Sequence, residues 1–307
     1  MNETATTETA AGPVVIIGNF DGVHRGHVEL IRTARAAEPG ARLVAVTFWP
    51  HPMSVVRPDQ TPPLLTSLDR RRELLRNAGV DEVVVVAFTP EVAGWSPEEF
   101  IDRVLRPLRP VRIVVGQNFR FGFRAAGDVH TLADRAAGEW KVQVVPLLTD
   151  GSQPSSSTLI RHAVAEGDFG RVRELSDQVF RFQGVVVQGD QRGRQMGYPT
   201  ANVRVAPGIA VPADGVYAGW VTRLDVPSPR WPAAISVGTN PTFDGVERRV
   251  EAYVLDRTDL ELYGVEIAID FYARMRGQVK YEGMESLIKQ MHRDVEQIRE
   301  VLSGHGT

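Results

Sequence analysis

The feature that most constrains the fold of this chain is a change of hydrophobic period near residue 180. Before it, from Pro13 to about Gly167, short β-branched apolar runs alternate with helical patterns, which predicts βαβ units and a parallel sheet. Each run is apolar on both faces, as in strands that helices cover on both sides. The predicted strands are Val14–Ile17, Leu43–Phe48, Val83–Phe88, Ile113–Val115 and Val142–Leu148, and the predicted helices are His27–Ala37, Leu68–Ala78, Pro97–Leu105, His130–Ala137 and Thr158–Glu166.

The second half, beyond about Phe180, predicts a different architecture. Its apolar runs are separated by clusters of Gly, Pro and Asn, and no helical pattern occurs until Gly283–Leu302. This pattern favours a closed or sandwiched antiparallel sheet, a β-barrel in the first case, followed by one terminal α-helix. The predicted strands are Phe182–Gln188, Val216–Arg223, Ala233–Val237, Val250–Asp256 and Val265–Arg274.

The length of 307 residues agrees with two domains, since ~150 residues per domain is typical. We therefore expect a disordered leader at residues 1–12 and an α/β Rossmann-like domain at 13–167. A partly helical connection at 168–180 and a β domain at 181–307 complete the predicted organisation.

Composition excludes several classes of protein. The absence of cysteine rules out disulfides, thiolate zinc sites, iron–sulfur clusters and cysteine nucleophiles, and it fits a reducing compartment, so we expect a cytoplasmic protein. A net charge of −3 gives no global positive field, so neither nucleic acid nor an anionic membrane is an expected partner. No apolar run approaches the ~18 residues of a membrane span, and the first twelve residues do not resemble a signal peptide. A homo-oligomer is left open.

The first candidate site follows the first predicted strand, where a glycine-containing loop leads into a helix that opens near His27. Ligands of parallel sheets bind beyond the carboxyl ends of the strands, and amides at a helix N-terminus approach phosphate closely. We therefore predict a phosphate site, although the loop matches neither the Walker nor the dinucleotide pattern. Its candidate residues are Gly18, Asn19, Phe20, Asp21, Gly22, His24 and His27.

The H-x-G-H pattern places two imidazoles at the mouth of this helix. Imidazoles can donate hydrogen bonds to phosphoryl oxygens while negative charge shifts during an in-line displacement, so His24 and His27 are candidate catalytic residues. The alternative is that His24 and His27 are a turn residue and a helix-capping residue.

Three further segments follow strands of the same half and would meet in one crevice. In the last of them, hydroxyls and amides can face an anion at a helix start, with a guanidinium one turn along; a plain cap with a surface arginine is the alternative. The Asn118–Phe121 segment mixes polar groups with aromatic rings and suits a flat ring system, although packing against the core explains it equally well. His51 lies between two prolines and has an equal chance of being structural. The candidate residues are Ser156, Ser157, Thr158 and Arg161 for phosphate, and His51, Asn118, Phe119, Arg120 and Phe121 for the ring system.

The second candidate site opens the second half, where glycines and arginines lie between a strand and a Pro-Thr turn. Such a flap can surround phosphates, although a hairpin loop with solvated arginines is the alternative. Thr200 and Asn202 then offer hard oxygen donors of the type that Mg²⁺ accepts. The phosphate candidates are Gly189, Arg192, Gly193, Arg194, Gly197, Thr200 and Asn202.

Glu251 is the candidate for proton chemistry in this half. It lies in a predicted strand neither face of which is plainly polar, so its carboxylate is either at an edge or directed at a site. A surface ion pair with Arg248 or Arg249 is the alternative.

Both sets of motifs carry a family resemblance. The string GNFDGVHRGH at 18–27 resembles the FMN adenylyltransferase module of bacterial riboflavin kinase/FAD synthetases, within the nucleotidyltransferase superfamily. The pattern G-x-V-x-x-G-x-x-R-G-R-x-x-G-[FY]-P-T-A-N at 184–202 resembles the riboflavin kinase domain of the same family. Tyr198 stands where most relatives have Phe, Asn118 where many have Asp, and Leu159 where many have a basic residue.

The resemblance implies a bifunctional enzyme of flavin biosynthesis. It would phosphorylate riboflavin with ATP and Mg²⁺ to FMN, and would transfer AMP from a second ATP to FMN, giving FAD and pyrophosphate. It further implies that Glu251 is the general base for the ribityl hydroxyl. An adenylyltransferase with an inactive, flavin-binding kinase domain and a non-catalytic flavin-responsive regulator are the alternatives.

Overall fold

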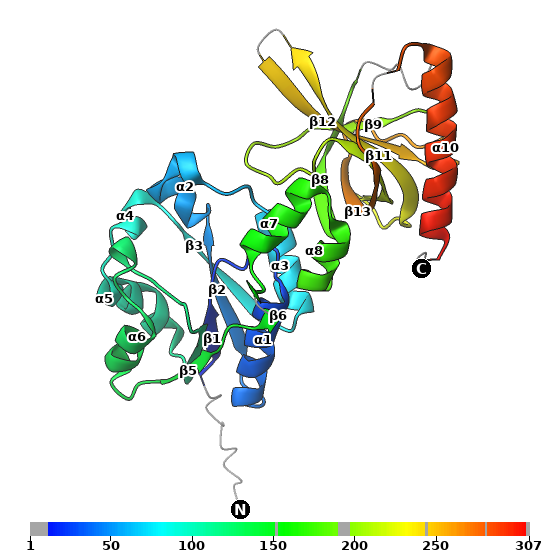
Figure 1. Ribbon diagram of the computed structural model, residues 1–307. Helices are drawn as coiled ribbons and strands as arrows, with labels where there is room; N and C mark the ends of the chain where they lie inside the picture. The colour runs from blue at the N-terminus through cyan, green and yellow to red at the C-terminus, as the bar shows by residue number, and fades with distance from the viewer. Residues whose placement is uncertain (1–11, 151–152, 190–196, 243–244, 280, 305–307) are drawn as a thin grey trace, which may run out of the picture. The chain divides into compact units, whose positions relative to one another are not determined.

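The computed structural model describes residues 12–150, 153–189, 197–242, 245–279 and 281–304 (Figure 1). The chain divides into two compact units, one of Met1–Pro62 with Ser67–Ser157 and one of Pro63–Thr66 with Thr158–Thr307. The predicted leader, apart from Gly12, lies outside the described residues. A short piece of the N-terminal half thus belongs to the second unit.

The first unit is built on a five-stranded parallel sheet of order β3-β2-β1-β4-β5, which confirms the predicted α/β fold. Buried side chains alternate between its two faces, with Ile16 in one core cluster and Ile17 in the other, because successive residues of a strand point to opposite faces. The strands are β1 Val14–Ile17, β2 Leu43–Trp49, β3 Glu82–Ala87, β4 Arg112–Gly116 and β5 Lys141–Val145.

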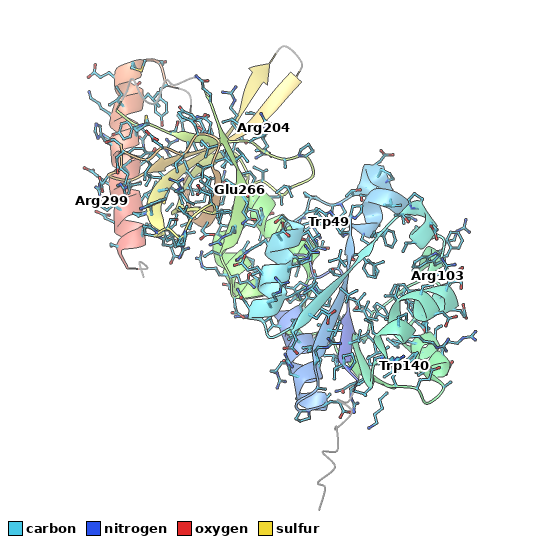
Figure 2. All side chains as sticks on the ribbon, turned by 180° about the vertical axis from the view of Figure 1, so that it is seen from behind. Trp49, Arg103, Trp140, Arg204, Glu266 and Arg299 are labelled. Carbon is cyan, nitrogen blue, oxygen red and sulfur yellow. The ribbon has the colours of Figure 1, made fainter. Side chains whose placement is uncertain are left out.

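The helices of this unit cover both faces of the sheet (Figure 1). On one face Leu30 and Leu75 pack with Ile16, and on the other Phe100, Leu132 and the Trp140 side chain labelled in Figure 2 pack with Ile17. The α-helices are α1 Arg25–Ala37, α2 Pro52–Val56, α3 Leu68–Asn77, α4 Pro90–Ala93, α5 Pro97–Phe100 and α6 Val129–Ala136.

Two predicted boundaries in this unit differ from the structure by more than two residues. The helix expected over Pro97–Leu105 is α-helical only to Phe100 and continues as a π-helix over Ile101–Leu105. The strand expected over Val142–Leu148 ends at Val145, and the chain then forms a two-residue hairpin, β6 Thr149–Asp150 with β7 Gln153–Pro154.

The second unit is a closed antiparallel barrel of order β10-β11-β12-β9-β8-β13, which confirms the predicted barrel. Tyr217, Ile235 and Phe271 fill its interior, and each is fully buried. The strands are β8 Phe180–Val187, β9 Ala201–Val203, β10 Gly215–Arg223, β11 Trp231–Thr242, β12 Gly245–Val254 and β13 Glu266–Arg276. The short strand β9 was not predicted, since three residues are too few to show a period of two.

Three helices pack on this barrel. The terminal helix α10 (Met284–Ser303) buries Ile298 and Leu302 against Trp220 on the outer face, as its apolar stripe predicts. The helices α7 (Ser157–Glu166) and α8 (Phe169–Ser176) add Ile160 and Phe169 to the barrel core, so the predicted connection at 168–180 contains a packed helix.

Residues Pro63–Thr66 are also part of the second unit. The Leu64 amide donates to the Gly208 carbonyl over 2.7 Å, and the Ala210 amide donates to the Leu64 carbonyl over 2.9 Å. Leu65 is 4% exposed and lies in the same core cluster as Ile160. The barrel core therefore includes a residue that precedes the first barrel strand, which begins at Phe180, by 115 positions.

Candidate active sites

The loop after β1 lies where the strand order of the parallel sheet reverses, between β1 and β4. This is the point where open α/β sheets bind ligands. Phe20 and Val23 adopt positive φ angles of 51° and 36°, and both side chains are fully buried. Such strain is retained mainly at functional sites, because the surrounding structure must compensate for it. The structure thus fixes the shape of this loop at the expected ligand edge.

His24 and His27 lie face to face at the start of α1. Their ring centroids are 3.7 Å apart with an interplanar angle of 26°. His24 is the N-cap residue by position, but its side chain makes no capping hydrogen bond, which disfavours the capping alternative for this residue. A Cβ on Gly26 would lie 3.1 Å from the His24 ring, so the glycine of H-x-G-H lets the two imidazoles approach.

The His27 imidazole is held in its neutral form. Burial, the neighbouring His24 and the Arg71 guanidinium, in that order, lower the pKa of His27 well below its usual value of 6.5. Among the described residues its Nδ1 atom is buried and has no hydrogen-bond partner. A neutral imidazole has one ring nitrogen that donates and one that accepts, so His27 can offer one hydrogen bond to a phosphoryl oxygen.

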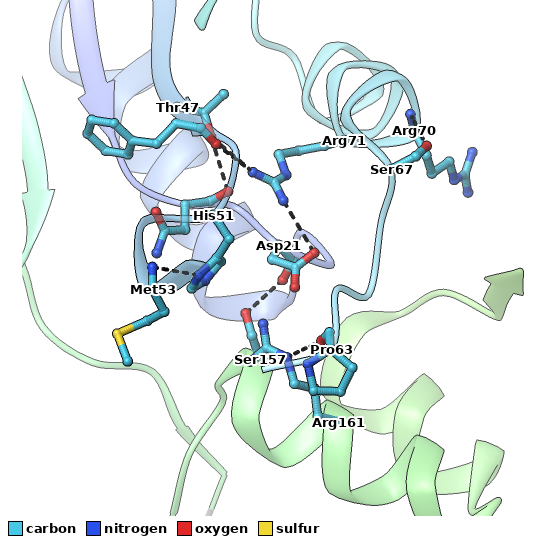
Figure 3. Close-up of polar contacts among 12 residues, drawn as sticks. Asp21, Thr47, His51, Met53, Pro63, Ser67, Arg70, Arg71, Ser157 and Arg161 are labelled. Carbon is cyan, nitrogen blue, oxygen red and sulfur yellow. Dashed lines mark hydrogen bonds and ion pairs between the residues drawn. The ribbon is translucent and has the colours of Figure 1, made fainter. Parts of the chain in front are cut away.

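A network of buried polar side chains contacts the loop after β1 (Figure 3). The Arg71 guanidinium is 3.5 Å from the Asp21 carboxylate, and these side chains are 0% and 1% exposed. Arg71 also donates to the Thr47 hydroxyl over 3.5 Å and to the Phe48 carbonyl over 3.3 Å. The Thr47 hydroxyl in turn donates to the Asn19 carbonyl over 3.1 Å. The network joins the loop after β1 to the end of β2.

Arg71 is the residue at the centre of this network, and no sequence motif singled it out. It lies in α3 on the same face as the buried Leu74 and Leu75, three and four positions further along the helix. An arginine on the apolar face of an amphipathic helix was therefore the available signal, but it belongs to no motif.

The serine segment before α7 contacts the same loop. The Ser157 hydroxyl donates to the Asp21 carbonyl over 2.7 Å, so it ties the start of α7 to the loop (Figure 3). Ser156 precedes it, and Thr158 follows it in the first turn of the helix. The Arg161 guanidinium, expected as a phosphate clamp, donates to the Pro63 carbonyl over 2.7 Å.

The residues expected to bind a ring system have other contacts as well. The His51 Nδ1 atom accepts from the Met53 amide over 3.2 Å and so caps α2. Phe121 is buried in the core with Phe119 stacked on it at 5.3 Å between ring centroids. Arg120 pairs with Asp128 over 3.2 Å, and Asn118 lies beside the end of β4 near Gly116.

The barrel of the second unit carries two neighbouring cavities. The larger, of about 730 Å³, is lined by Gly189, Gly197, Thr200 and Asn202 on one side and by Leu262 and Tyr263 on another. The smaller, of about 420 Å³, is lined by Asp214, Ser236, Arg249, Glu251 and Gln278, of which only Glu251 was a candidate from sequence.

Glu251 connects the two cavities. Its strand neighbours Val250 and Ala252 point into the barrel core, so its carboxylate points outward. The Thr200 hydroxyl, which lines the larger cavity, donates to Glu251 Oε2 over 3.4 Å, and Glu251 itself lines the smaller one. Arg248, one of the two partners considered for a surface ion pair, instead pairs with Asp214 over 3.1 Å.

The residues expected as oxygen donors for a cation lie in β9 and just before it. Asn202 is paired in register with Glu251, and Thr200 donates to the same carboxylate. A Cβ on Gly189 would lie 2.4–2.7 Å from the Asn202 amide, so only glycine allows this approach. In the described part of the chain no three His, Cys, Asp or Glu side chains cluster as metal ligands. Arg192, Gly193 and Arg194 lie outside the described residues.

Both halves match known families. Residues 6–159 match the family model described as FAD synthetase, and residues 176–302 match the model described as riboflavin kinase. A bifunctional riboflavin kinase/FMN adenylyltransferase from Listeria monocytogenes is 35% identical, covering 95% of this chain and 93% of that protein. The corresponding Bacillus subtilis protein is 34% identical, covering 94% and 92%.

A solved structure shares the whole architecture. A Streptococcus pneumoniae protein described as a macrolide-efflux protein superposes with a TM-score of 0.85 at 31% identity and covers 95% of each chain. In the described part of the present chain, no helix has the length and apolar character needed to cross a membrane.

Proposed function

The chain belongs to the bifunctional riboflavin kinase/FMN adenylyltransferase family and makes FMN and FAD, and on this premise we propose which of its residues carry each activity. We assign adenylyl transfer to the first unit and the kinase to the second. The match of one family model to each half supports this division.

Adenylyl transfer is assigned to the loop after β1. An FMN phosphate oxygen attacks the α-phosphorus of ATP, and the bond from that phosphorus to the bridging oxygen of pyrophosphate breaks. His24 and His27 donate hydrogen bonds to the phosphate chain while negative charge moves to pyrophosphate. The stacked imidazoles at a helix start support this role.

We assign the remaining candidates of the first site to binding the phosphates and the flavin around His24 and His27. The loop residues bind phosphate through their amides, together with the hydroxyls of the serine segment and the Arg161 guanidinium. The flavin ring is assigned to the segments after β2 and β4. The phosphate-binding set is Gly18, Asn19, Phe20, Asp21, Gly22, Ser156, Ser157, Thr158 and Arg161, and the flavin-binding set is His51, Asn118, Phe119, Arg120 and Phe121.

The kinase is assigned to the two cavities of the barrel. We place the nucleotide in the larger cavity and riboflavin in the smaller, with Glu251 between them as the general base. Glu251 takes the proton of the ribityl 5′-hydroxyl as that oxygen attacks the γ-phosphorus of ATP and the bond to ADP breaks. The single observation that carries this assignment is the contact of Glu251 with Thr200 across the two cavities.

Magnesium is assigned to Thr200 and Asn202. Their hydroxyl and amide oxygens are hard donors, and the neighbouring Glu251 carboxylate adds negative charge. When bound, Mg²⁺ neutralises the charge of the phosphates. The phosphate-binding flap of Gly189, Arg192, Gly193, Arg194 and Gly197 remains part of the proposal.

We propose a cytoplasmic location, which the absence of cysteine supports, because a reducing compartment keeps no disulfides. The net charge of −3 likewise supports the proposal that nucleic acid is no partner.

The division of labour is tested by two substitutions assayed with riboflavin, ATP and Mg²⁺, with riboflavin, FMN and FAD resolved by chromatography. His27→Ala should abolish formation of FAD from FMN and leave FMN formation unchanged. Glu251→Gln should lower FMN formation about 10²–10⁴-fold, the usual contribution of a general base, and leave FAD formation from added FMN unchanged. Glu266→Gln, an exposed glutamate at the start of β13, is the matched control. Loss of both activities in a folded variant would refute the assignment.

A further inference from the structure

We infer that Arg71 is a positioning residue for adenylyl transfer, whose buried guanidinium holds the Asp21 carboxylate and the loop that carries His24 and His27 in a phosphate-binding shape. This inference rests on the proposed function of the first unit. It adds a residue that lies outside every motif and contacts no solvent.

Arg71 packs against the buried side of the loop after β1. Its side chain is fully buried, and its guanidinium reaches Asp21 in the loop and Thr47 and Phe48 at the end of β2. Its Cζ atom lies 5.5 Å from the centroid of the Trp49 ring. Arg71 therefore joins the segments that follow β1 and β2, which are 26 or more positions apart in the sequence, and we assign it to holding these segments rather than to binding the substrate.

Filling space does not explain why position 71 carries a charged side chain. Burying a guanidinium is costly, and an apolar side chain of similar volume would pack the site at least as well. The benefit of the charge is electrostatic. The Arg71 guanidinium pairs with the Asp21 carboxylate inside the buried loop, and its positive charge acts on His27. We therefore expect the effect of Arg71 to appear in the protonation of the site as well as in its shape.

His27 is the group that reports this effect. Its neighbours are His24 in the loop, Arg71 in α3 and Phe20, whose ring centroid is 5.1 Å from that of His27. Arg71 in turn contacts the Asp21 carboxylate and the neutral Thr47 hydroxyl at the end of β2. Arg71 lowers the pKa of His27, so its removal should raise that pKa. A neutral imidazole binds ground-state phosphates less tightly than an imidazolium, and it still responds to charge that develops on pyrophosphate.

The test measures FMN adenylylation by the full chain between pH 5.5 and 9. Riboflavin phosphorylation by the same molecules measures the folded second unit, and hydrogen-exchange protection of the β1 amides measures the folded first unit. Arg71→Met should lower kcat at pH 7.5 at least tenfold and should move the acid limb of the kcat/KM profile to higher pH. Arg76→Met, an exposed arginine of the same helix, is the matched control and should change neither quantity. An unchanged pH profile and rate in Arg71→Met would overturn the inference.

Arg71→Lys keeps the test decisive if the methionine variant does not fold. It preserves the charge but loses the planar fork, so the acid limb should stay at the wild-type position while kcat falls. Wild-type kcat and KM in Arg71→Lys would overturn the positioning role. His27→Ala distinguishes failure of the proposed site from failure of the inference on Arg71, because FAD formation retained in that variant refutes the proposed site itself. FAD formation lost in His27→Ala but kept in Arg71→Met refutes the inference on Arg71 alone.

Discussion

Lowering the pH should destabilise the first unit through His27. The folded chain lowers the pKa of this imidazole below its unfolded value of 6.5, chiefly by burial. In the pH range below 6.5 the unfolded chain therefore binds the proton more readily than the folded chain, and the free energy of unfolding falls as protons are added. The stability contributed by the neutral group is complete above about pH 6.5 and is lost as the pH decreases below it.

The size of the effect follows from the unfolded-state pKa alone. At pH 5.5, one unit below 6.5, protonation of the unfolded chain is worth up to about 1.4 kcal/mol, if His27 remains neutral in the folded chain. At pH 7.5 the free energy of protonating His27 in the unfolded chain is close to zero. His27→Gln, which cannot be protonated, should be relieved of this penalty.

Hydrogen exchange of the β1 amides is the appropriate assay, because β1 is the central strand of the sheet and its exchange reports opening of the first unit. Wild type and His27→Gln are compared at the same pH, so intrinsic exchange rates cancel. Between pH 7.5 and 5.5 the protection of wild-type β1 relative to the variant should fall up to about tenfold. His130→Gln, an exposed histidine of α6, is the matched control and should behave as wild type.

The reasoning is refuted if wild type and His27→Gln lose protection equally over this pH range. The β10 amides of the second unit provide an internal reference, since they lie in a barrel that does not contain His27. Equal changes in β1 and β10 would point to a general effect of acid rather than to this imidazole.

Two further predictions concern the second unit. Gly189→Ala should abolish FMN formation and leave adenylylation of added FMN unchanged, because the new Cβ would lie 2.4–2.7 Å from the Asn202 amide. Gly283→Ala, where a Cβ would meet no atom within 4 Å, is the control. Wild-type kinase activity in Gly189→Ala would contradict the role of this close approach. Leu65→Ala should lower the free energy of unfolding of the barrel by about 2–5 kcal/mol, measured by urea denaturation with hydrogen exchange of β10, because Leu65 is 4% exposed in the barrel core. Leu224→Ala, at 38% exposure, should cost far less, and equal losses would mean that Pro63–Thr66 does not contribute to the barrel core.

Local patterns predicted the elements of both units well. The parallel sheet follows from runs that are apolar on both faces, and the barrel follows from short strands separated by turn residues. Errors occurred where an element is too short to show its period, as in β9, or where helix type depends on packing, as in the π-helix over Ile101–Leu105. Periodicity gives no signal in either case.

The motif residues were also predictable, because each motif combines its chemistry and its turn geometry within a few positions. Gly26 between the two histidines and Gly189 against Asn202 show that such glycines serve close approaches, and the structure places both. The sequence could not show that His51 caps α2 or that Phe121 is part of the core, since both roles depend on neighbours that the motif does not contain.

By itself, the sequence determined two domains of different architecture, their motifs and the chemistry that those motifs can perform. Only the tertiary structure decided that Arg71 lies against Asp21, that Leu65 enters the barrel core and that Glu251 connects two cavities. These pairs are 50 or more positions apart in the chain. The stability of a buried charge or an apolar side chain depends on the residues that folding brings next to it, and the neighbouring sequence does not reveal which residues these are.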